Sequence, residues 1–229
     1  MIQYRRRLFY ALVNCSEERP VGRRKSQLIH DDILAVASDL FYEHGINNVG
    51  ISRIISDAGV AKMTLYSHFD SKQALVIAYL ENRSREWVDW YRGQLYKMPL
   101  TPKDRLLSSF DVLDKWFTSK RYRGCLIANA IIELADDRHP VHEVKREYYA
   151  SIKNMYLTLA QEAELQDCEY VAEQLFVFLR EAMMAAYLDG PSGVVESCRK
   201  RTHFTIEREL ANIQMQTRDV SRQTGGTPD

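Results

Sequence analysis

The strongest constraint on this chain is an apolar pattern with the period of an α-helix, which recurs from residue 26 almost to the C-terminus. Apolar residues return every three or four positions at Ile29, Ile33, Val36, Ala37, Leu40 and Phe41, and again at Val171, Leu175, Phe178, Leu179, Ala182, Met183 and Ala186. A helix with this spacing has one apolar face, which must be buried against other helices. The sequence shows no strand-like alternation of useful length, so we predict an all-α fold.

Breaks in the apolar pattern predict where the helices end. Glycine adopts the left-handed conformation that often follows a helix, so we expect the first helix to end at Gly45 and the second, 51–58, at Gly59. Asp70 is the expected N-cap of a long fourth helix, with Gln73 completing a capping box. The other expected helices are 60–69, a single helix carrying Leu106, Phe110, Leu113 and Phe117 on one face, 124–135, 141–164, one carrying the repeat at 171–186, and 194–213.

Composition excludes several classes of protein. The chain of 229 residues is 45% apolar and 27% charged, as in folded proteins, and no apolar run approaches the ~18 residues of a membrane-spanning helix. The 31 basic and 31 acidic residues cancel, which excludes a basic protein that coats nucleic acid by bulk charge. Four cysteines, at positions 15, 125, 168 and 198, form no C-x-x-C pair. They argue against a zinc module or disulfide scaffold and suit a reducing cytoplasm, where we expect the protein.

Charge is distributed unevenly and helps to divide the chain. Residues 1–25 carry seven Arg or Lys and two Glu, whereas residues 26–72 carry three basic and six acidic residues. We expect residues 1–25 to be a basic, disordered extension and residues 26–72 to be a small helical domain. Residues 73–214 would form a larger helical domain, and residues 215–229, which lack apolar periodicity, a disordered tail.

The basic extension has two other interpretations. Arg5, Arg6 and Arg7 precede the apolar run Leu8–Val13 and resemble the start of an export signal, but the run is shorter than the ~7–15 residues that such a signal requires. A start codon assigned too far upstream would also produce this segment. In that case the natural chain begins near Val21.

The expected helices 51–58 and 60–69 point to function. They are joined by Ala58-Gly59-Val60-Ala61, and a short turn with glycine between two short helices is typical of a helix-turn-helix. The second helix of such a motif enters the DNA major groove, and the first crosses the DNA backbone. Leu65 and Phe69, four residues apart, would pack inward and leave the polar side chains for DNA. The alternative is that these residues only pack a small bundle.

These residues resemble the DNA-binding domain of the tetracycline-repressor (TetR) family. The resemblance rests on Phe41–Gly45, on Ile51 and Ile54, on the run AGVAKMTLYSHF from Ala58 to Phe69, and on Ser71-Lys72 followed by Ala74-Leu75. It covers about 45 residues in register, far more than a short motif. The family's order of helices also fits, with a three-helix N-terminal domain, a connecting fourth helix and a further helical domain. A weaker similarity to segments of the family's effector domains covers Arg123–Asn129 and Glu133, followed by His139–Val141.

The resemblance implies roles for single residues. Thr64, Tyr66 and Lys72 occupy positions where family members contact phosphate, and Arg53 one where members often touch the DNA backbone or a base. Positions that approach bases are occupied here by Lys62, Met63, Ser67 and His68. The chemistry agrees, because hydroxyls and lysine suit phosphate oxygens, Lys62 can reach guanine acceptors, and Met63 can touch a thymine methyl group.

Three positions depart from the family pattern. Ala61 replaces the usual Ser or Thr N-cap of the recognition helix, and loss of a cap costs about 0.5–2 kcal/mol. Gly50 replaces the usual N-cap of the preceding helix, where glycine is nearly as good. Ile55 replaces a usual alanine, so the local packing must differ.

The second half of the chain is rich in aromatic residues. In members of the family, helices four to eight enclose a small-molecule cavity, and a bound ligand moves helix four. The resemblance therefore implies an effector of unknown identity, with candidate binding residues Trp87, Tyr91, Phe110, Phe117, Asn129, Ile152, Met155 and Phe176. The alternative for each residue is that it belongs to an ordinary bundle core.

The last two helices are expected to pair with their copies in a homodimer. Ala182, Ala185 and Ala186 would allow close helix approach, and Met183, Met184 and Tyr187 would supply contact area. A single helix-turn-helix reads few bases, so a two-fold dimer would read two half-sites ~34–36 Å apart, or a multiple of that distance. The alternative is that these side chains form the core of one chain.

Other patterns give no competing function. His139 and His142 stand at a helix entrance without a third ligand, so we expect no metal and no cofactor. Gly190–Gly193 lacks the lysine and the length of a phosphate loop, and the sequence has no G-x-S-x-G, so we expect no enzyme. Cys125 follows Arg123 and could sense redox state, although Leu126 and Ile127 favour a buried, inert thiol.

Together the patterns predict a dimeric, TetR-like regulator that a small molecule releases from a palindromic operator, most simply a repressor. The alternative is a DNA-binding regulator without a small-molecule ligand, controlled by a protein partner or by redox chemistry at a cysteine.

Overall fold

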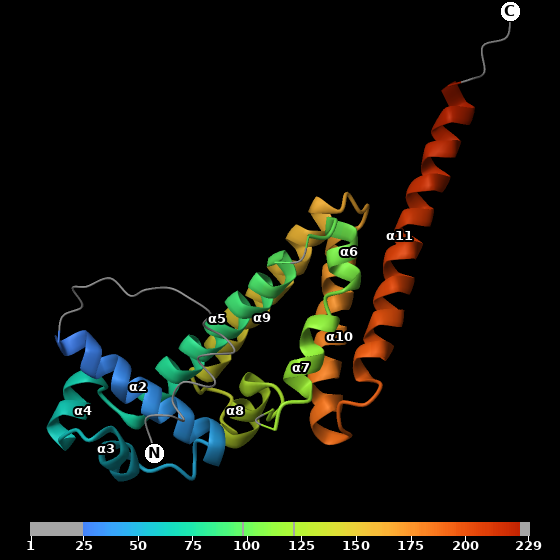
Figure 1. Ribbon diagram of the computed structural model, residues 1–229. Helices are drawn as coiled ribbons and strands as arrows, with labels where there is room; N and C mark the ends of the chain where they lie inside the picture. Colours follow the sequence, from blue (N-terminus) through green and yellow to red (C-terminus); the bar gives the residue numbers. More distant parts are fainter. Residues whose placement is uncertain (1–24, 98, 121, 225–229) are drawn as a thin grey trace, which may run out of the picture. The chain divides into compact units, whose positions relative to one another are not determined.

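The computed structural model describes residues 25–97, 99–120 and 122–224, with the backbone alone for Lys25 and residues 212–224. Its regular structure in these ranges is entirely helical (Figure 1), which confirms the all-α prediction. No helix in the same ranges is long and apolar enough to cross a membrane. The basic extension predicted at the N-terminus lies outside the described residues.

The chain folds into two compact units. The first contains residues up to Trp90 together with Cys125–Tyr148, and the second contains Tyr91–Gly124 together with the residues from Tyr149 onward. Two of the crossings between the units lie inside continuous helices, α5 (Lys72–Lys97) and α9 (Val141–Glu162). A helix therefore carries the chain from one unit into the other at both points.

The first unit is built around three helices, α2 (Lys25–His44), α3 (Ile51–Ala58) and α4 (Lys62–His68), which pack on one another near the start of α5 (Figure 1). Helix α8 (Leu126–Leu134) and the first part of α9 belong to the same unit. The side chains that form its core, each less than 3% exposed, are Ile33, Ala37, Phe41, Ile54, Leu65 and Leu75. Gly45 ends α2 and Gly59 ends α3, both with positive φ, as predicted.

The second unit contains the rest of α5 and α9 with three short helices, α6 (Pro102–Leu107), the 3₁₀ turn η1 (Asp111–Leu113) and α7 (Asp114–Phe117). Two long helices complete it, and they pack along each other: α10 (Cys168–Leu188) and α11 (Val194–Thr224). Its core contains Tyr91, Leu95, Phe110, Tyr156, Leu175 and Leu179, all fully buried.

The prediction of one helix through Leu106 and Phe117 is wrong. The segment is broken into α6, η1 and α7, with turns at Ser108 and Ser109. Serine competes for backbone hydrogen bonds and weakens helix interiors, which explains the break. The predicted inward-facing set, Leu106, Phe110, Leu113 and Phe117, is nevertheless buried, because each short piece still turns its apolar residues inward.

The expected cap of α5 is also corrected. The Ala74 N–H donates to Ser71 Oγ at 3.0 Å, and the Leu75 N–H donates to the Ser71 carbonyl, so Ser71 rather than Asp70 is the N-cap. Both residue types cap well, and the helix starts one residue later than predicted. At the other end of the chain, α11 continues to Thr224, beyond the apolar pattern that ends near Ile213.

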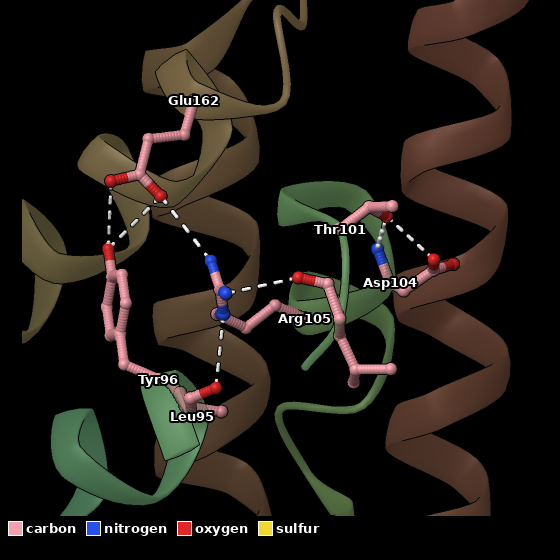
Figure 2. Close-up of polar contacts among 7 residues, drawn as sticks. Leu95, Tyr96, Thr101, Asp104, Arg105 and Glu162 are labelled. Atoms are coloured by element: carbon pink, nitrogen blue, oxygen red, sulfur yellow. Dashed lines mark hydrogen bonds and ion pairs between the residues drawn. The ribbon is translucent and has the colours of Figure 1, made fainter. Parts of the chain in front are cut away.

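A single arginine connects three segments of the second unit. Figure 2 shows Arg105 of α6 donating to the Leu95 carbonyl at the end of α5 and pairing with Glu162 at the end of α9. Its guanidinium also donates to the Leu100 carbonyl and lies 4.5 Å from the centre of the Tyr96 ring. The Tyr96 hydroxyl in turn donates to Glu162. The planar fork of arginine suits this arrangement better than lysine would.

We expect Arg105→Met to lower the free energy of unfolding by about 1.5–3 kcal/mol, because the Leu95 and Leu100 carbonyls and Glu162 would lose a charged partner. The Arg105 side chain is only 12% exposed, so water replaces it poorly. Urea unfolding of both variants measures the effect, with exposed Arg138→Met as the control, expected within ±0.5 kcal/mol of the parent. Equal losses in the two variants would contradict this account.

Candidate nucleic-acid interface

Gly59 makes the turn between α3 and α4 possible. Its φ of 64° lies in the left-handed region, which glycine reaches without a steric penalty. The Gly59 N–H donates to the Ser56 carbonyl, and the Val60 N–H donates to the Ile55 carbonyl, so the end of α3 is satisfied by its own turn. Helix α4 then begins at Lys62. The predicted helix-turn-helix is present.

Two buried side chains set the rotation of α4 about its axis. Leu65 is 0% exposed and Phe69, directly after the helix, is 4% exposed. The ring of His30 on α2 stacks on Phe69 with the ring centres 4.6 Å apart, and it meets the edge of His68 at 6.0 Å. Sequence reasoning missed His30, although it precedes Ile33 by three residues and so shares the inner face of α2. These contacts decide which face of α4 points outward.

The outward face carries four of the six contact residues predicted on α4. Lys62 lies four residues before Tyr66, and Met63 lies four residues before Ser67, so each pair shares a helix face. The two pairs are adjacent, and all four side chains are exposed. Met63 is 81% exposed, the highest fraction among the exposed large apolar side chains of the described residues. Helix α4 contains no carboxylate, so nothing on it repels a polyanion. The predicted residues that are half-buried are Thr64, His68 and Lys72.

Two predicted contact residues also have partners within the chain. Ser67 Oγ donates to the Thr64 carbonyl at 2.8 Å. Arg53 Nη2 donates to His44 Nε2 at 2.9 Å, and Arg53 Nε lies 3.9 Å from Asp57 Oδ2. Both side chains remain exposed, so these bonds position them without burying them.

The starts of α3 and α4 lack side-chain caps. Gly50 and Ala61 both have the extended backbone of an N-cap, but neither makes a side-chain cap hydrogen bond. The loss of a side-chain cap, predicted from Gly50 and Ala61 in the sequence, is thus confirmed at both helix starts. The first N–H groups of α4 are therefore left for water or for a ligand.

A contact that the sequence does not predict joins α8 to this motif. The Asn47 N–H, in the loop between α2 and α3, donates to the carboxylate of Glu133, and Asn47 Nδ2 donates to the Glu133 carbonyl at 2.7 Å. The two residues are separated by 86 positions. No local pattern could have revealed the pair.

Hydroxyl groups gather inside the second unit. The Tyr91 hydroxyl donates to the Ser109 carbonyl at 3.0 Å and lies 2.8 Å from the Tyr156 hydroxyl. Burial raises the pKa of both tyrosines well above its ordinary value, so both stay neutral. The Ser109 side chain lies beside the two hydroxyls, and its hydrogen bonding opposes part of the rise in their pKa. Thr202 Oγ1 on α11 is buried and has no hydrogen-bond partner among the described residues.

The predicted effector-binding residues are divided between the units. Trp87 and Asn129 lie in the first unit, where the Trp87 ring meets the edge of Tyr148 at 5.9 Å. The remaining candidates belong to the second unit, each at most 5% exposed: Tyr91, Phe110, Phe117, Ile152, Met155 and Phe176. Of these, Tyr91 belongs to the hydroxyl cluster, and Phe176 packs instead against Tyr149 and under Lys153.

The expected interface side chains on α10 do not all face outward. Ala182, Met183 and Ala186 are 1%, 2% and 4% exposed, so they belong to the core of the second unit, as the alternative interpretation had it. Met184 and Tyr187 are 37% and 46% exposed and are available to a partner. The prediction that the three buried residues form a dimer interface is therefore wrong, because the apolar repeat to which they belong forms the inner face of α10.

Burial disfavours the thiolate form of two of the described cysteines. Burial raises the pKa of the Cys198 thiol to about 11, with Arg201 opposing it. The pKa of Cys168 is raised by burial and by Asp167. Cys125 is buried. Thiolate is the reactive form, and a raised pKa makes it scarce at neutral pH.

The sequence matches a known family at this motif. Residues 33–79 match the family described as bacterial regulatory proteins, tetR family. The chain is 21% identical over 170 residues to the HTH-type transcriptional regulator YjdC of Escherichia coli, covering 74% of this chain and 89% of that protein. It is 36% identical over 85 residues to the HTH-type transcriptional activator FasR of Mycolicibacterium smegmatis, covering 34% of this chain and 39% of that protein.

Solved structures share the fold along most of the chain. SCO4454, a TetR-family transcriptional regulator from Streptomyces coelicolor, is similar with a TM-score of 0.70 and 25% identity, over 80% of this chain and 96% of that one. The likeness therefore extends beyond the helix-turn-helix into the larger helical domain.

The missing cap of α4 gives a direct test of the local structure. Ala61→Ser should raise the free energy of unfolding by about 0.5–2 kcal/mol, because serine at an N-cap can accept a hydrogen bond from the first turn. Gly50→Ser, which meets no atom within 4 Å, should gain only a few tenths. Denaturant unfolding measures both. A gain at Gly50 as large as that at Ala61 would contradict the assignment of the α4 start.

Proposed function

Because the chain belongs to the TetR family of DNA-binding transcriptional regulators, we propose that it is a homodimeric repressor that a small molecule releases from a palindromic operator. The observation that carries this proposal is the outward face of α4, where Lys62, Met63 and Tyr66 are exposed on a helix anchored by Leu65 and Phe69. Such a regulator acts where the DNA is, so we place it in the bacterial cytoplasm.

The side chains divide into two kinds of DNA contact. Lys62 and Met63 occupy the first turn of α4. Because a recognition helix enters the major groove with this end, both residues are assigned to base contacts. Ser67 and His68 are assigned to bases as well. Thr64, Tyr66 and Lys72 are assigned to phosphates, which position a protein without reading sequence. Arg53, held by His44, is assigned to the DNA backbone beside α3.

An exposed apolar surface on the last two helices supports the homodimer. Val177, Met184 and Leu188 of α10 are 40%, 37% and 68% exposed. These residues follow one another at intervals of seven and four, so they share a helix face. Phe204 of α11 is 73% exposed. Apolar side chains that gather on one face are typical of protein interfaces, and a two-fold dimer would match an inverted-repeat operator.

The hydroxyl cluster in the second unit supports an effector site. An apolar interior with a few neutral hydrogen-bonding groups suits a small, uncharged ligand. The neighbouring hydroxyls of Tyr91, Tyr156 and Ser109 would supply those groups. A ligand can move the equilibrium between DNA-binding and released forms only through its difference in affinity for the two.

A second candidate function is activation of transcription. Its support is the 36% identity to a relative named as a transcriptional activator. Control by cysteine oxidation has less support, because burial raises the pKa of Cys168 and Cys198. Transcription from a reporter gene that carries the protein's DNA-binding site, measured with and without the protein, separates repression from activation.

Selection of binding sites from random duplex DNA at near-physiological salt tests the function itself. An enriched inverted repeat supports a two-fold, sequence-reading dimer and supplies the probe for a ligand screen. A folded, dimeric protein that enriches no sequence, even after refolding to remove a co-purified ligand, would overturn the proposal.

The two kinds of contact should respond differently to substitution. Lys72→Ala and Tyr66→Phe should weaken binding by similar factors on all DNA sequences, and Lys72→Ala should also reduce the salt dependence, because phosphate contacts release counterions. Lys62→Ala should change which bases are preferred at the positions it faces. Site selection and salt titration measure these effects. An identical change of preference in all three variants would contradict the assignment.

The proposed interface makes a prediction about assembly. The double substitution Met184→Glu and Leu188→Glu should convert the dimer to monomer, because four carboxylates would meet across a two-fold apolar contact. Sedimentation equilibrium measures the state. Ile132→Glu on α8, where the isoleucine is 71% exposed in the first unit, is the control and should remain dimeric. A dimeric double variant would place the interface elsewhere.

A further inference from the structure

The loop that leads into α3 is held by a residue outside the helix-turn-helix. Glu133, at the end of α8, lies beside the loop 45–50 within the first unit. Its carboxylate accepts the Asn47 N–H, and its carbonyl accepts Asn47 Nδ2 at 2.7 Å. A hydrogen bond to a charged acceptor is about twice as strong as one between neutral groups. The pair is therefore a substantial link between α8 and the loop.

Gly45 fits closely against this carboxylate. A Cβ at Gly45 would lie 3.0 Å from Glu133 Oε1, closer than most Cβ contacts in proteins. Two other hydrogen bonds of the loop return to α2: the Gly45 N–H donates to the Phe41 carbonyl, and Asn48 Nδ2 donates to the His44 carbonyl. Glu133 thus supplies a support for the loop that α2 does not.

The loop sets the start of α3. Gly50, its last residue, is the N-cap of α3 and makes no side-chain cap hydrogen bond. Helix α3 packs on α4, so a displaced loop would change the angle at which α4 is presented. The Gly50 carbonyl accepts the Arg53 and Ile54 N–H groups, so the position of the loop fixes where α3 begins.

We propose that Glu133 is a positioning residue for DNA binding, whose carboxylate fixes the loop 45–50 and through it the arrangement of α3 and α4 that reads DNA. The proposal rests on the DNA-binding function proposed above. Without the carboxylate, the loop samples other arrangements. The affinity for DNA then falls in proportion to the fraction of molecules that still hold the DNA-binding arrangement.

The sign of the effect separates positioning from simple electrostatics. Removal of a carboxylate from the unit that binds DNA would by itself strengthen binding to a polyanion. Positioning predicts the opposite, a weaker complex. Glu133→Gln loses the same charge but keeps an oxygen that can accept the Asn47 N–H, so it distinguishes the two effects.

The experiment measures affinity for the selected operator and for an unrelated duplex. We expect Glu133→Ala to lower operator affinity about tenfold and Glu133→Gln to stay within about threefold of the parent. The operator-to-unrelated affinity ratio should fall in Glu133→Ala, whereas partial unfolding would lower the active fraction and leave this ratio unchanged. Asp137→Ala, which removes an exposed carboxylate just after α8, is the control and should not lower the ratio.

Hydrogen exchange reports the loop directly. Amides of residues 45–50 should exchange faster in Glu133→Ala than in the parent and Asp137→Ala. Glu133→Asp is the second variant, because it keeps the charge but shortens the side chain, which draws the carboxylate away from the Asn47 N–H. It should weaken operator binding several-fold.

The proposal is overturned if Glu133→Ala binds the operator as tightly as the parent or more tightly, or if it fails to fold and Glu133→Asp binds normally. A parent protein that selects no DNA sequence would instead overturn the proposed function. The two failures are therefore distinguishable.

Discussion

The burial of Leu65 and Phe69 is the constraint on which the DNA-binding part of this molecule depends. Helix α4 has only seven residues, and helices shorter than about 12–15 residues are marginal alone in water. It also lacks a side-chain cap, which removes a further source of local stability. Its formation and its rotation must therefore come from packing on α2 and α3. The same packing leaves Lys62, Met63 and Tyr66 outward.

The second unit solves a different problem, that of polar groups in an apolar interior. The hydroxyls of Tyr91 and Tyr156 satisfy each other and the Ser109 carbonyl. Arg105 satisfies two backbone carbonyls where α5 ends and the chain turns. The Ser109 side chain adds a third hydroxyl to this pair. Thr202 Oγ1 does not fit this scheme, because it is buried in the same unit without a hydrogen-bond partner.

Local sequence predicted the helices and the outer face of α4 well, because these follow from period, glycine and side-chain type. Leu65 and Phe69 fall four residues apart and are both buried, and Gly45 and Gly59 end their helices. The same reasoning failed where tertiary packing decides. Ala182 and Met183 look suited to an interface yet lie in the core, because an apolar stripe does not say whether its partner is the same chain or a copy. Glu133 and Asn47 carry no local signal of their contact.

The size of the Glu133 contact bears on how such a regulator could switch. A shift from 1:99 to 99:1 between two forms requires about 5.5 kcal/mol of differential binding, whereas one hydrogen bond to a charged group contributes about 1.5–3 kcal/mol. A single copy of the contact is thus too weak to hold the DNA-binding form alone, but a two-fold dimer contains it twice. The two copies of the contact together would contribute about 3–6 kcal/mol, which is close to the free energy that such a shift requires. The proposed homodimer would therefore double both the surface that reads DNA and the energy of the loop contacts that support it.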